Sequence, residues 1–183
     1  MLMKLDLSLQ QNIKIMNSLL GAYCSLQDFF KTNEIFDSII SNGELNNETV
    51  SIMIKLNTYI SLGHVQQFWN GIYEFGLLPD EDNYKQFVVA HCYYERYDDA
   101  LRVVEGMKDY DLEVRGDLIE TLYKWTKNDE KRLVLERWAR ENYKGIWNEL
   151  EPRLKIEGEV KQDKNEVNES NVFVTKEFIH EGY

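Results

Sequence analysis

Apolar residues recur along most of the chain at intervals of three and four, which is the spacing of one face of an α-helix. Between Tyr97 and Met107 the apolar positions fall at offsets 0, 3, 4, 7 and 10, while charged residues take the other face. Glycine and proline, which punctuate strands and turns, are scarce. The pattern predicts paired helices at residues 13–25 and 28–41, 48–62 and 64–75, 81–94 and 97–110, and 115–127 and 129–142.

The predicted helix pairs recur at a nearly constant interval. Their first helices begin near Ile13, Thr49, Glu81 and Val114, at spacings of 36, 32 and 33 residues. A two-helix unit cannot bury its apolar face alone and must stack on its neighbours. We therefore expect an all-α fold of about four helix-turn-helix repeats within residues 13–150. The expected divisions are a lead-in at 1–12, units near 13–48, 49–80, 81–113 and 114–145, and a polar tail at 151–183.

The breaks between units share one pattern: a residue that ends a helix, then apolar residues, then a polar residue that begins the next helix. They read SNGELNN, EFGLLPD and KDYDLEV. Gly43 and Gly76 stand where a helix end needs a left-handed residue, and Pro79 prevents continuation of the helix. The third break has Asp111 at the glycine position and Val114 at the proline position.

Composition and charge limit the possible functions. The 183 residues carry a net charge of −11, with 21 Lys and Arg against 32 Asp and Glu. Affinity for nucleic-acid backbones comes mainly from Lys and Arg, so the chain is not expected to be a general polyanion binder. An acidic surface suits a basic protein partner. We expect no membrane span, and the first residues have the pattern of neither a secretory signal nor an Arg-rich presequence.

The sequence offers no pattern for catalysis or metal binding. Cys24 and Cys92 lie in apolar helical runs outside any CxxC pair, which predicts core packing rather than a disulfide or a zinc site. His64, His91 and His180 are far apart and have no acidic or cysteine partner at ligand spacing. Gly-rich phosphate loops, GxSxG and HExxH do not occur in the sequence. We expect a protein that is not an enzyme and uses no cofactor or metal.

The repeated units carry a residue pattern that resembles the pentatricopeptide repeat family. The pattern is a unit of about 35 residues with tyrosine and cysteine in the first helix, Ala-Leu in the second, and Gly-apolar-x-Pro-Asp at the end. Tetratricopeptide repeats have similar length, but they would place small residues at fixed positions in both helices. The matching positions are Asn17, Leu19, Leu20, Tyr23, Cys24, Ile35, Phe36 and Gly43, then Tyr59, Gly63, Val65, Gly76, Pro79 and Asp80, then Tyr84, Phe87, Val88, Cys92, Ala100, Leu101 and Met107.

The resemblance implies a right-handed α-α superhelix, or solenoid, that binds single-stranded RNA, usually in mitochondria or chloroplasts. Repeats of this kind read one base per unit, with one side chain near the start of the first helix and another at the last position of the unit. Carried over onto this sequence, the candidate RNA contacts are Asn17, Met53 and Lys85 in first helices, Asn47, Asp80 and Arg115 at unit ends, and Leu118 in the fourth unit.

The candidate contacts differ in chemistry. The amides of Asn17 and Asn47 can both donate to and accept from a base edge. Lys85 with Arg115 suits a phosphate better than a base. The stretch from Tyr123 to Lys144 is locally basic and carries two tryptophans, Trp125 and Trp138, so it can hold nucleic acid by stacking and charge, meet a protein partner, or place both rings in the core.

Two functions stay open from the sequence. The first is a mitochondrial RNA-binding adaptor for transcript stability, processing or translation, with single-stranded RNA and proteins of a gene-expression complex as partners. The second is a non-catalytic scaffold whose acidic solenoid holds a basic protein or a larger assembly such as a ribosome. The mitochondrial location is implied by the resemblance, and a cytoplasmic location is the alternative.

The last part of the chain breaks the repeat pattern. Trp147, Leu150 and Leu154 have the spacing of one more short helix, and Pro152 argues for a break within it. The residues beyond are rich in Asn, Glu and Lys, as expected of a flexible tail. Within this tail, VFVTKEFI has the composition of a docking segment.

Overall fold

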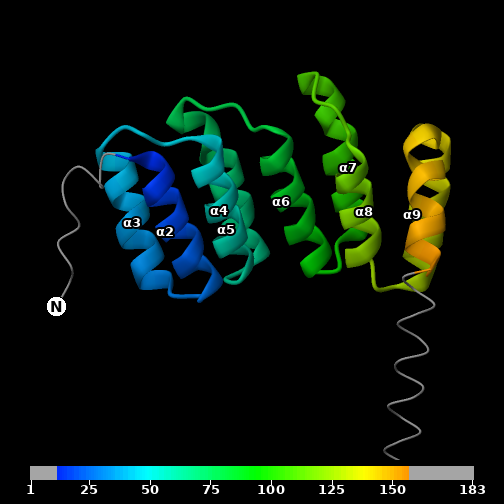
Figure 1. Ribbon diagram of the computed structural model, residues 1–183, viewed down its shortest axis with the longest axis horizontal. Coiled ribbons are helices and arrows are strands. Elements are labelled where there is room, and N and C mark those ends of the chain that lie inside the picture. Colours follow the sequence, from blue (N-terminus) through cyan, green and yellow to red (C-terminus); the bar gives the residue numbers. More distant parts are fainter. Residues whose placement is uncertain (1–11, 157–183) are drawn as a thin grey trace, which may run out of the picture. The chain divides into compact units, whose positions relative to one another are not determined.

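The computed structural model describes residues 12–156, and in that range the regular elements are all helical, with no strand (Figure 1). The chain divides into two compact parts at Leu135 and Glu136. The elements in chain order are α2 (Ile13–Ser25), α3 (Phe29–Ser41), α4 (Asn47–Thr58), α5 (Leu62–Gly71), the 3-10 turn η1 (Ile72–Phe75), α6 (Glu81–Tyr93), α7 (Tyr97–Gly106), the 3-10 turn η2 (Met107–Tyr110), α8 (Gly116–Trp125), α9 (Asp129–Asn142) and a helix at residues 144–156.

The predicted all-α class is confirmed, and the helix starts agree with those predicted within one or two residues. Polar caps explain these starts, since a side-chain oxygen satisfies a free amide of the first turn. Asn12 accepts from the amide of Lys14, and Asp80 forms a reciprocal capping box with Asn83. Ser61 caps α5, so α4 ends at Thr58 rather than at the predicted residue 62.

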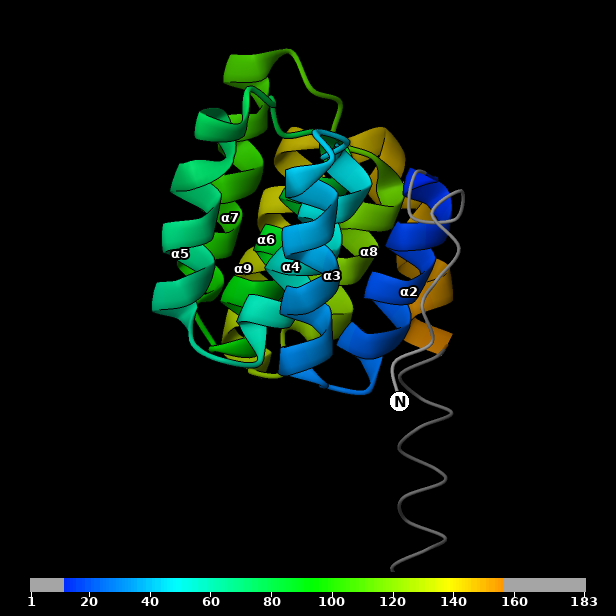
Figure 2. The ribbon, with the colours of Figure 1, turned by 90° about the vertical axis from the view of Figure 1, so that its left-hand side faces the viewer.

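In the part up to Leu135, the first helix of each unit packs on the first helix of the next. Helix α2 contacts α4, α4 contacts α6, and α6 contacts α8, while α3, α5 and α7 each pack on the first helix of their own unit. Figure 2 shows α5 and α7 on one side of this stack and α2 and α8 on the other. Buried side chains from several units therefore share each core cluster, such as Leu20, Phe36 and Met53.

Polar contacts between units join residues about one repeat apart. The Nδ2 of Asn83 donates to the hydroxyl of Ser51 at 2.8 Å, across 32 positions of sequence. The hydroxyl of Tyr94 donates to the carbonyl of Thr58 at 2.9 Å, across 36 positions. Each contact spans about one repeat length, and together they hold one helix pair in register on the next.

The three breaks between units adopt the same backbone conformation. Gly43, Gly76 and Asp111 have φ values of 70°, 73° and 56°, which is the left-handed region. Glycine reaches this region without steric cost, whereas an L-residue with a Cβ does not. The third break thus keeps the geometry of the other two without their glycine.

In the part from Glu136 onward, the helix at 144–156 buries Trp147, Leu150 and Leu154, as their spacing predicts. The break expected at Pro152 is wrong, because the helix continues past this residue, which lies on the exposed side. The tail expected to begin at residue 151 is therefore helical up to residue 156. Residues 1–11 and 157–183, with the VFVTKEFI segment, lie outside the described residues.

The conformation of Asp111 leads to a prediction about stability. Replacing Asp111 by Gly removes the left-handed strain, so the free energy of unfolding should rise by about 0.5–1 kcal/mol. Chemical denaturation of both proteins measures the difference. Asp109→Gly is the matched control, because Asp109 lies in η2 outside the positive-φ positions and its replacement should lower stability. Equal effects of the two changes would contradict the strain argument.

Candidate nucleic-acid interface

Three aromatic side chains stand at equivalent places at the ends of successive first helices. Tyr59 follows the last residue of α4, and Tyr93 and Trp125 are the last residues of α6 and α8. The ring centroids are 6.3 Å apart between Tyr59 and Tyr93, and 6.3 Å apart between Tyr93 and Trp125. We call these three residues the aromatic row. The row runs from one repeat to the next rather than along one helix.

Further side chains lie on the same helix faces as the aromatic row. Residues four and eight positions earlier share the face of a helical residue. The positions four earlier are Lys55, Val89 and Thr121, and those eight earlier are Ser51, Lys85 and Asp117. The aromatic row and the residues four and eight positions before it thus form three parallel rows across α4, α6 and α8.

An open pocket of about 290 Å³ lies along these rows. The charged residues that line it, among those described, are Lys55 and Lys85. Tyr93 is 48% exposed, and Tyr59 and Trp125 are half-buried. An exposed aromatic face can stack on a nucleobase, and a lysine beside it can contact the phosphate. The remaining lining residues are Thr58, Gln86, Val89 and Thr121.

Acidic side chains of the first helices gather at the end away from the aromatic row. They occupy the first turns of α4, α6 and α8, where the helix dipole favours anions. These residues are Glu48, Glu81, Asp82 and Asp117. Glu120 lies further along α8 and binds Lys124 at 2.8 Å. Among the charged residues of the three rows, Lys55 lies about one turn before the aromatic row, whereas Lys85 and Asp117 both lie about two turns before it.

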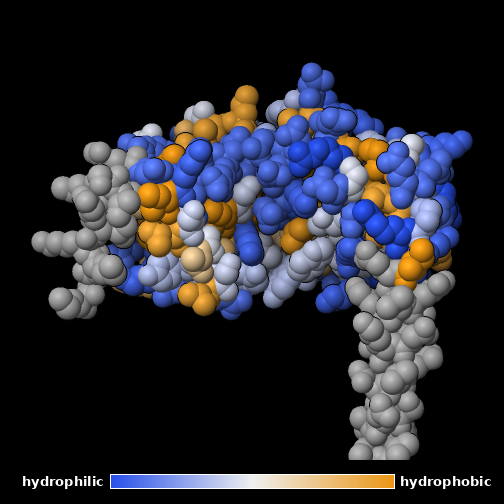
Figure 3. Space-filling model, in the orientation of Figure 1, coloured by the Kyte–Doolittle hydropathy of each residue, from blue (hydrophilic) through white to orange (hydrophobic). Residues whose placement is uncertain are grey.

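Hydropathy also varies along the stack. On the face shown in Figure 3, hydrophobic residues gather over the region of α2 to α4, while hydrophilic residues prevail over α6 to α8. Exposed apolar side chains of the first unit include Leu26 and Phe30. On this face the residues therefore become more hydrophilic from the first units toward α6 and α8.

Asn17, the candidate base reader of the first unit, lies inside the protein. It is 1% exposed, and its Nδ2 donates to Asn46 at 3.1 Å and to Glu48 at 2.9 Å. Its Oδ1 accepts from the hydroxyl of Thr49 at 2.7 Å. Both ends of the amide are therefore used to hold α2 against α4, and neither is exposed where a base could contact it.

Several other candidate contacts also serve the fold. Met53 and Leu118 are buried in the core, so their side chains are not exposed to a ligand. Asp80 caps α6 by accepting from the amide of Asn83. The Nδ2 of Asn47 donates to the carbonyl of Leu78 at 3.1 Å, which ties the start of α4 to the next break between units.

Lys85 and Arg115 are the candidate contacts that the structure brings together in an exposed position. The Nζ of Lys85 lies 2.7 Å from Oδ2 of Asp117, and the Nε of Arg115 lies 3.3 Å from Oδ1 of the same carboxylate. Arg115 also contacts Asp82 at 3.3 Å. The hydrogen bond from Lys85, with smaller effects of both cations, holds the pKa of Asp117 below its ordinary value.

Sequence reasoning missed Tyr59 and Tyr93 as one surface feature. His91, two residues before Tyr93, is by contrast buried, and its Nδ1 lies 2.9 Å from the carbonyl of Phe87. The signal was present in the spacing, since Tyr59, Tyr93 and Trp125 follow one another at 34 and 32 residues. Alignment of the units on the ends of their first helices would have found it.

The basic stretch from Tyr123 to Lys144 does not act as one surface element in the structure. Trp125 belongs to the aromatic row, and Arg132 lies over the ring of Tyr123 at 5.3 Å. In the part of the chain from Glu136 onward, Trp138 packs against Tyr143, with ring centroids 5.1 Å apart.

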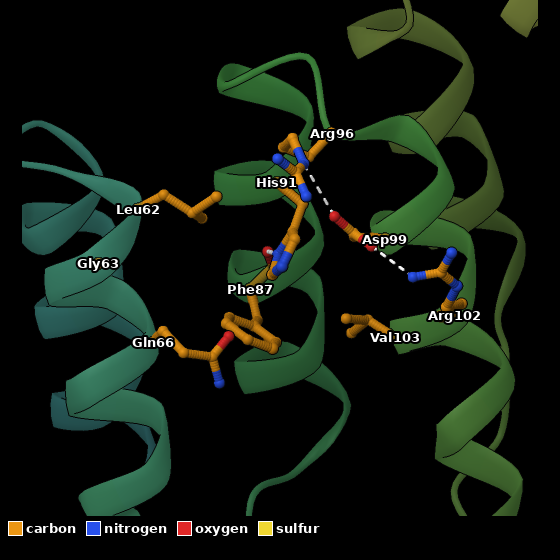
Figure 4. A pocket seen from close by; sticks show the side chains of 9 residues that line it. All are labelled: Leu62, Gly63, Gln66, Phe87, His91, Arg96, Asp99, Arg102 and Val103. Atoms are coloured by element: carbon orange, nitrogen blue, oxygen red, sulfur yellow. Dashed lines mark hydrogen bonds and ion pairs between the residues drawn. The ribbon is translucent and has the colours of Figure 1, made fainter.

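A second pocket, of about 560 Å³, lies between α5 and α7 with α6 as its floor (Figure 4). Figure 4 shows Arg96 and Arg102 on either side of Asp99. The Nε of Arg96 and the Nη1 of Arg102 contact Asp99 at 2.9 Å and 2.7 Å, and the hydrogen bond from Arg96 is the main cause that lowers the pKa of Asp99. The charges of this pocket are thus engaged with one another, and the rings in its lining, Phe87 and His91, are buried, unlike Tyr93 in the first pocket.

The thiols and imidazoles of the described residues form no chemical centre. Burial raises the pKa of Cys92 to about 12 and also raises that of Cys24, so neither is an activated thiolate at neutral pH. No group of three or more potential metal ligands occurs within residues 12–156. None of the helices in that range has the length and apolar character required to cross a bilayer.

A scan against models of protein families and a search of curated proteins both find no match for this chain. The resemblance to pentatricopeptide repeats therefore depends on the residues described above.

The hydrogen bonds of Asn17 lead to a second prediction. Replacing Asn17 by Ala removes its buried hydrogen bonds to Thr49, Asn46 and Glu48, so the free energy of unfolding should fall by about 1–3 kcal/mol. Ser18→Ala, at the exposed neighbouring position of α2, should have little effect. If Asn17 were a base reader, its replacement would weaken RNA binding at unchanged stability. Thermal unfolding and RNA titration of both variants separate the two roles.

Proposed function

We propose that this protein binds single-stranded RNA on the side of the first helices, by stacking bases on the aromatic row and contacting phosphates with nearby lysines. The observation that carries the proposal is the exposed ring of Tyr93 between Tyr59 and Trp125, in a pocket whose charged lining residues are lysines. Stacking accepts any base, because every base has a π-face. The mode is therefore tolerant of sequence rather than a code of one base per repeat.

The finer architecture is part of this proposal. We assign the helix pairs to a right-handed α-α superhelix of the pentatricopeptide kind. The support is the register of contacts one repeat apart, such as Asn83 with Ser51, and the shared left-handed conformation at the unit ends. Action on mitochondrial transcripts rests on the family resemblance alone.

The scarcity of free cations shapes the expected binding. Lys55 makes no ion pair with a carboxylate of residues 12–156, whereas Lys85 is bound to Asp117. For single strands, log K falls with log salt at about −0.7 per neutralised phosphate. With about one or two phosphates contacted, binding should depend only weakly on salt. A strong dependence would point to contacts outside the aromatic row.

Removal of the exposed ring tests the proposal. Tyr93→Ala should raise the Kd for a fluorescent single-stranded oligouridylate by about 5- to 150-fold, because stacking contributes about 1–3 kcal/mol per base. Tyr93→Phe should bind almost as the wild-type protein does, since it keeps the ring. Phe30→Ala is the matched control, because Phe30 is an exposed aromatic residue on α3, outside the row.

Absence of RNA binding by the wild-type protein at low salt would reject the proposal. The scaffold hypothesis would then take its place, and it predicts a complex with a basic protein that survives nuclease treatment. Exposed acids on the second helices, such as Glu34, Asp37 and Asp98, would supply the surface for it.

A further inference from the structure

Two cations from consecutive repeats converge on one carboxylate, that of Asp117 in the first turn of α8. Lys85 belongs to α6, and Arg115 and Asp117 stand at the start of α8. One oxygen of Asp117 contacts Lys85 Nζ at 2.7 Å, and the other contacts Arg115 Nε at 3.3 Å. Both oxygens of the carboxylate are therefore used, each by a different cation.

This cluster borders the RNA-binding pocket of the proposed function. Lys85 lines that pocket together with Tyr93 and Trp125. Lys85 and Tyr93 lie eight residues apart on one face of α6, and Asp117 and Trp125 lie eight residues apart on one face of α8. The side chains of Lys85, Arg115 and Asp117 are 28%, 49% and 46% exposed, so solvent and ligands reach all three.

The chemistry of the two cations fits a phosphodiester. The guanidinium of Arg115 offers several N–H donors in a fixed plane, and the ammonium of Lys85 is a compact point charge. Two oxygens on one atom are what a phosphodiester presents, and the carboxylate of Asp117 presents the same pair of acceptors. Asp117 thus occupies the position that a backbone phosphate would take between these cations.

We propose that Lys85 and Arg115 form a phosphate-binding subsite at the border of the proposed RNA-binding pocket. In the free protein Asp117 occupies this subsite and thereby weakens its affinity for phosphate. The inference rests on the proposed function for its RNA ligand, but the subsite can be tested without base stacking. Asp82 and Glu81 also face Arg115, so the cluster as a whole carries no excess of positive charge. A phosphate must displace Asp117 to bind, and this competition lowers backbone affinity.

The test uses the full chain and two probes of equal length, a single-stranded oligouridylate and an abasic oligonucleotide that carries phosphates without bases. Asp117→Asn should bind the abasic probe about 3- to 10-fold more tightly than the wild-type protein at low salt. The slope of log K against log salt should steepen by about 0.7, which corresponds to one added phosphate contact. Asp98→Asn is the matched control, since Asp98 pairs with Lys131 at the same distance of 2.7 Å between α7 and α9.

The double variant Lys85→Ala/Asp117→Asn tests whether the tighter abasic binding depends on the subsite. This variant should bind the abasic probe no more tightly than the wild-type protein does. Persistence of the gain in the double variant, or an equal gain in Asp98→Asn, would overturn the inference, because either result reflects net charge alone. Unchanged abasic binding in Asp117→Asn would also overturn it, even if the wild-type protein binds oligouridylate through Tyr93. Tighter abasic binding without any Tyr93-dependent RNA binding would support the subsite and reject the stacking proposal.

Discussion

The contact of each first helix with the next one is the constraint on which the structure depends. A pair of helices exposes an apolar face that it cannot bury alone, so burial requires the neighbouring unit. Buried hydrogen bonds set the register of this contact, as Asn17 does between α2 and α4. Since one register holds along α2, α4, α6 and α8, a side chain at a given helix position meets its counterpart in the next repeat.

Because of this register, equivalent residues of successive repeats lie side by side on one surface. Single aromatic residues at three helix ends become a continuous row, and single charges become contacts between units. The same constraint explains why the net charge of −11 does not describe the charge of each surface of the protein. Acids cluster where helix dipoles stabilise them, and the far ends of the helices are free to carry other side chains.

The sequence was sufficient for the elements and for the breaks between them, because helical spacing and caps act over a few residues. The start of α6 at Glu81 follows from Asp80 and Asn83 alone. The sequence alone did not predict which side chains are exposed to solvent, because exposure depends on the neighbouring helix. Asn17 has the chemistry of a reader, but α4 buries it. The break expected at Pro152 was wrong for a related reason. A helix that buries Trp147, Leu150 and Leu154 on one face tolerates the loss of one backbone hydrogen bond at a proline on its exposed side.

The central place of α6 has a consequence for cooperativity. This helix contacts α4, α5, α7 and α8, and it buries seven side chains between Asn83 and Cys92. In a linear array, stability is approximately a sum of nearest-neighbour terms, so end units open more readily than inner ones. Fraying of α2 and α3 would leave the interfaces of α6 intact. The residues around Lys85 and Tyr93 are thus carried by the helix whose amides should exchange with solvent most slowly, and local opening of the first unit need not disturb them.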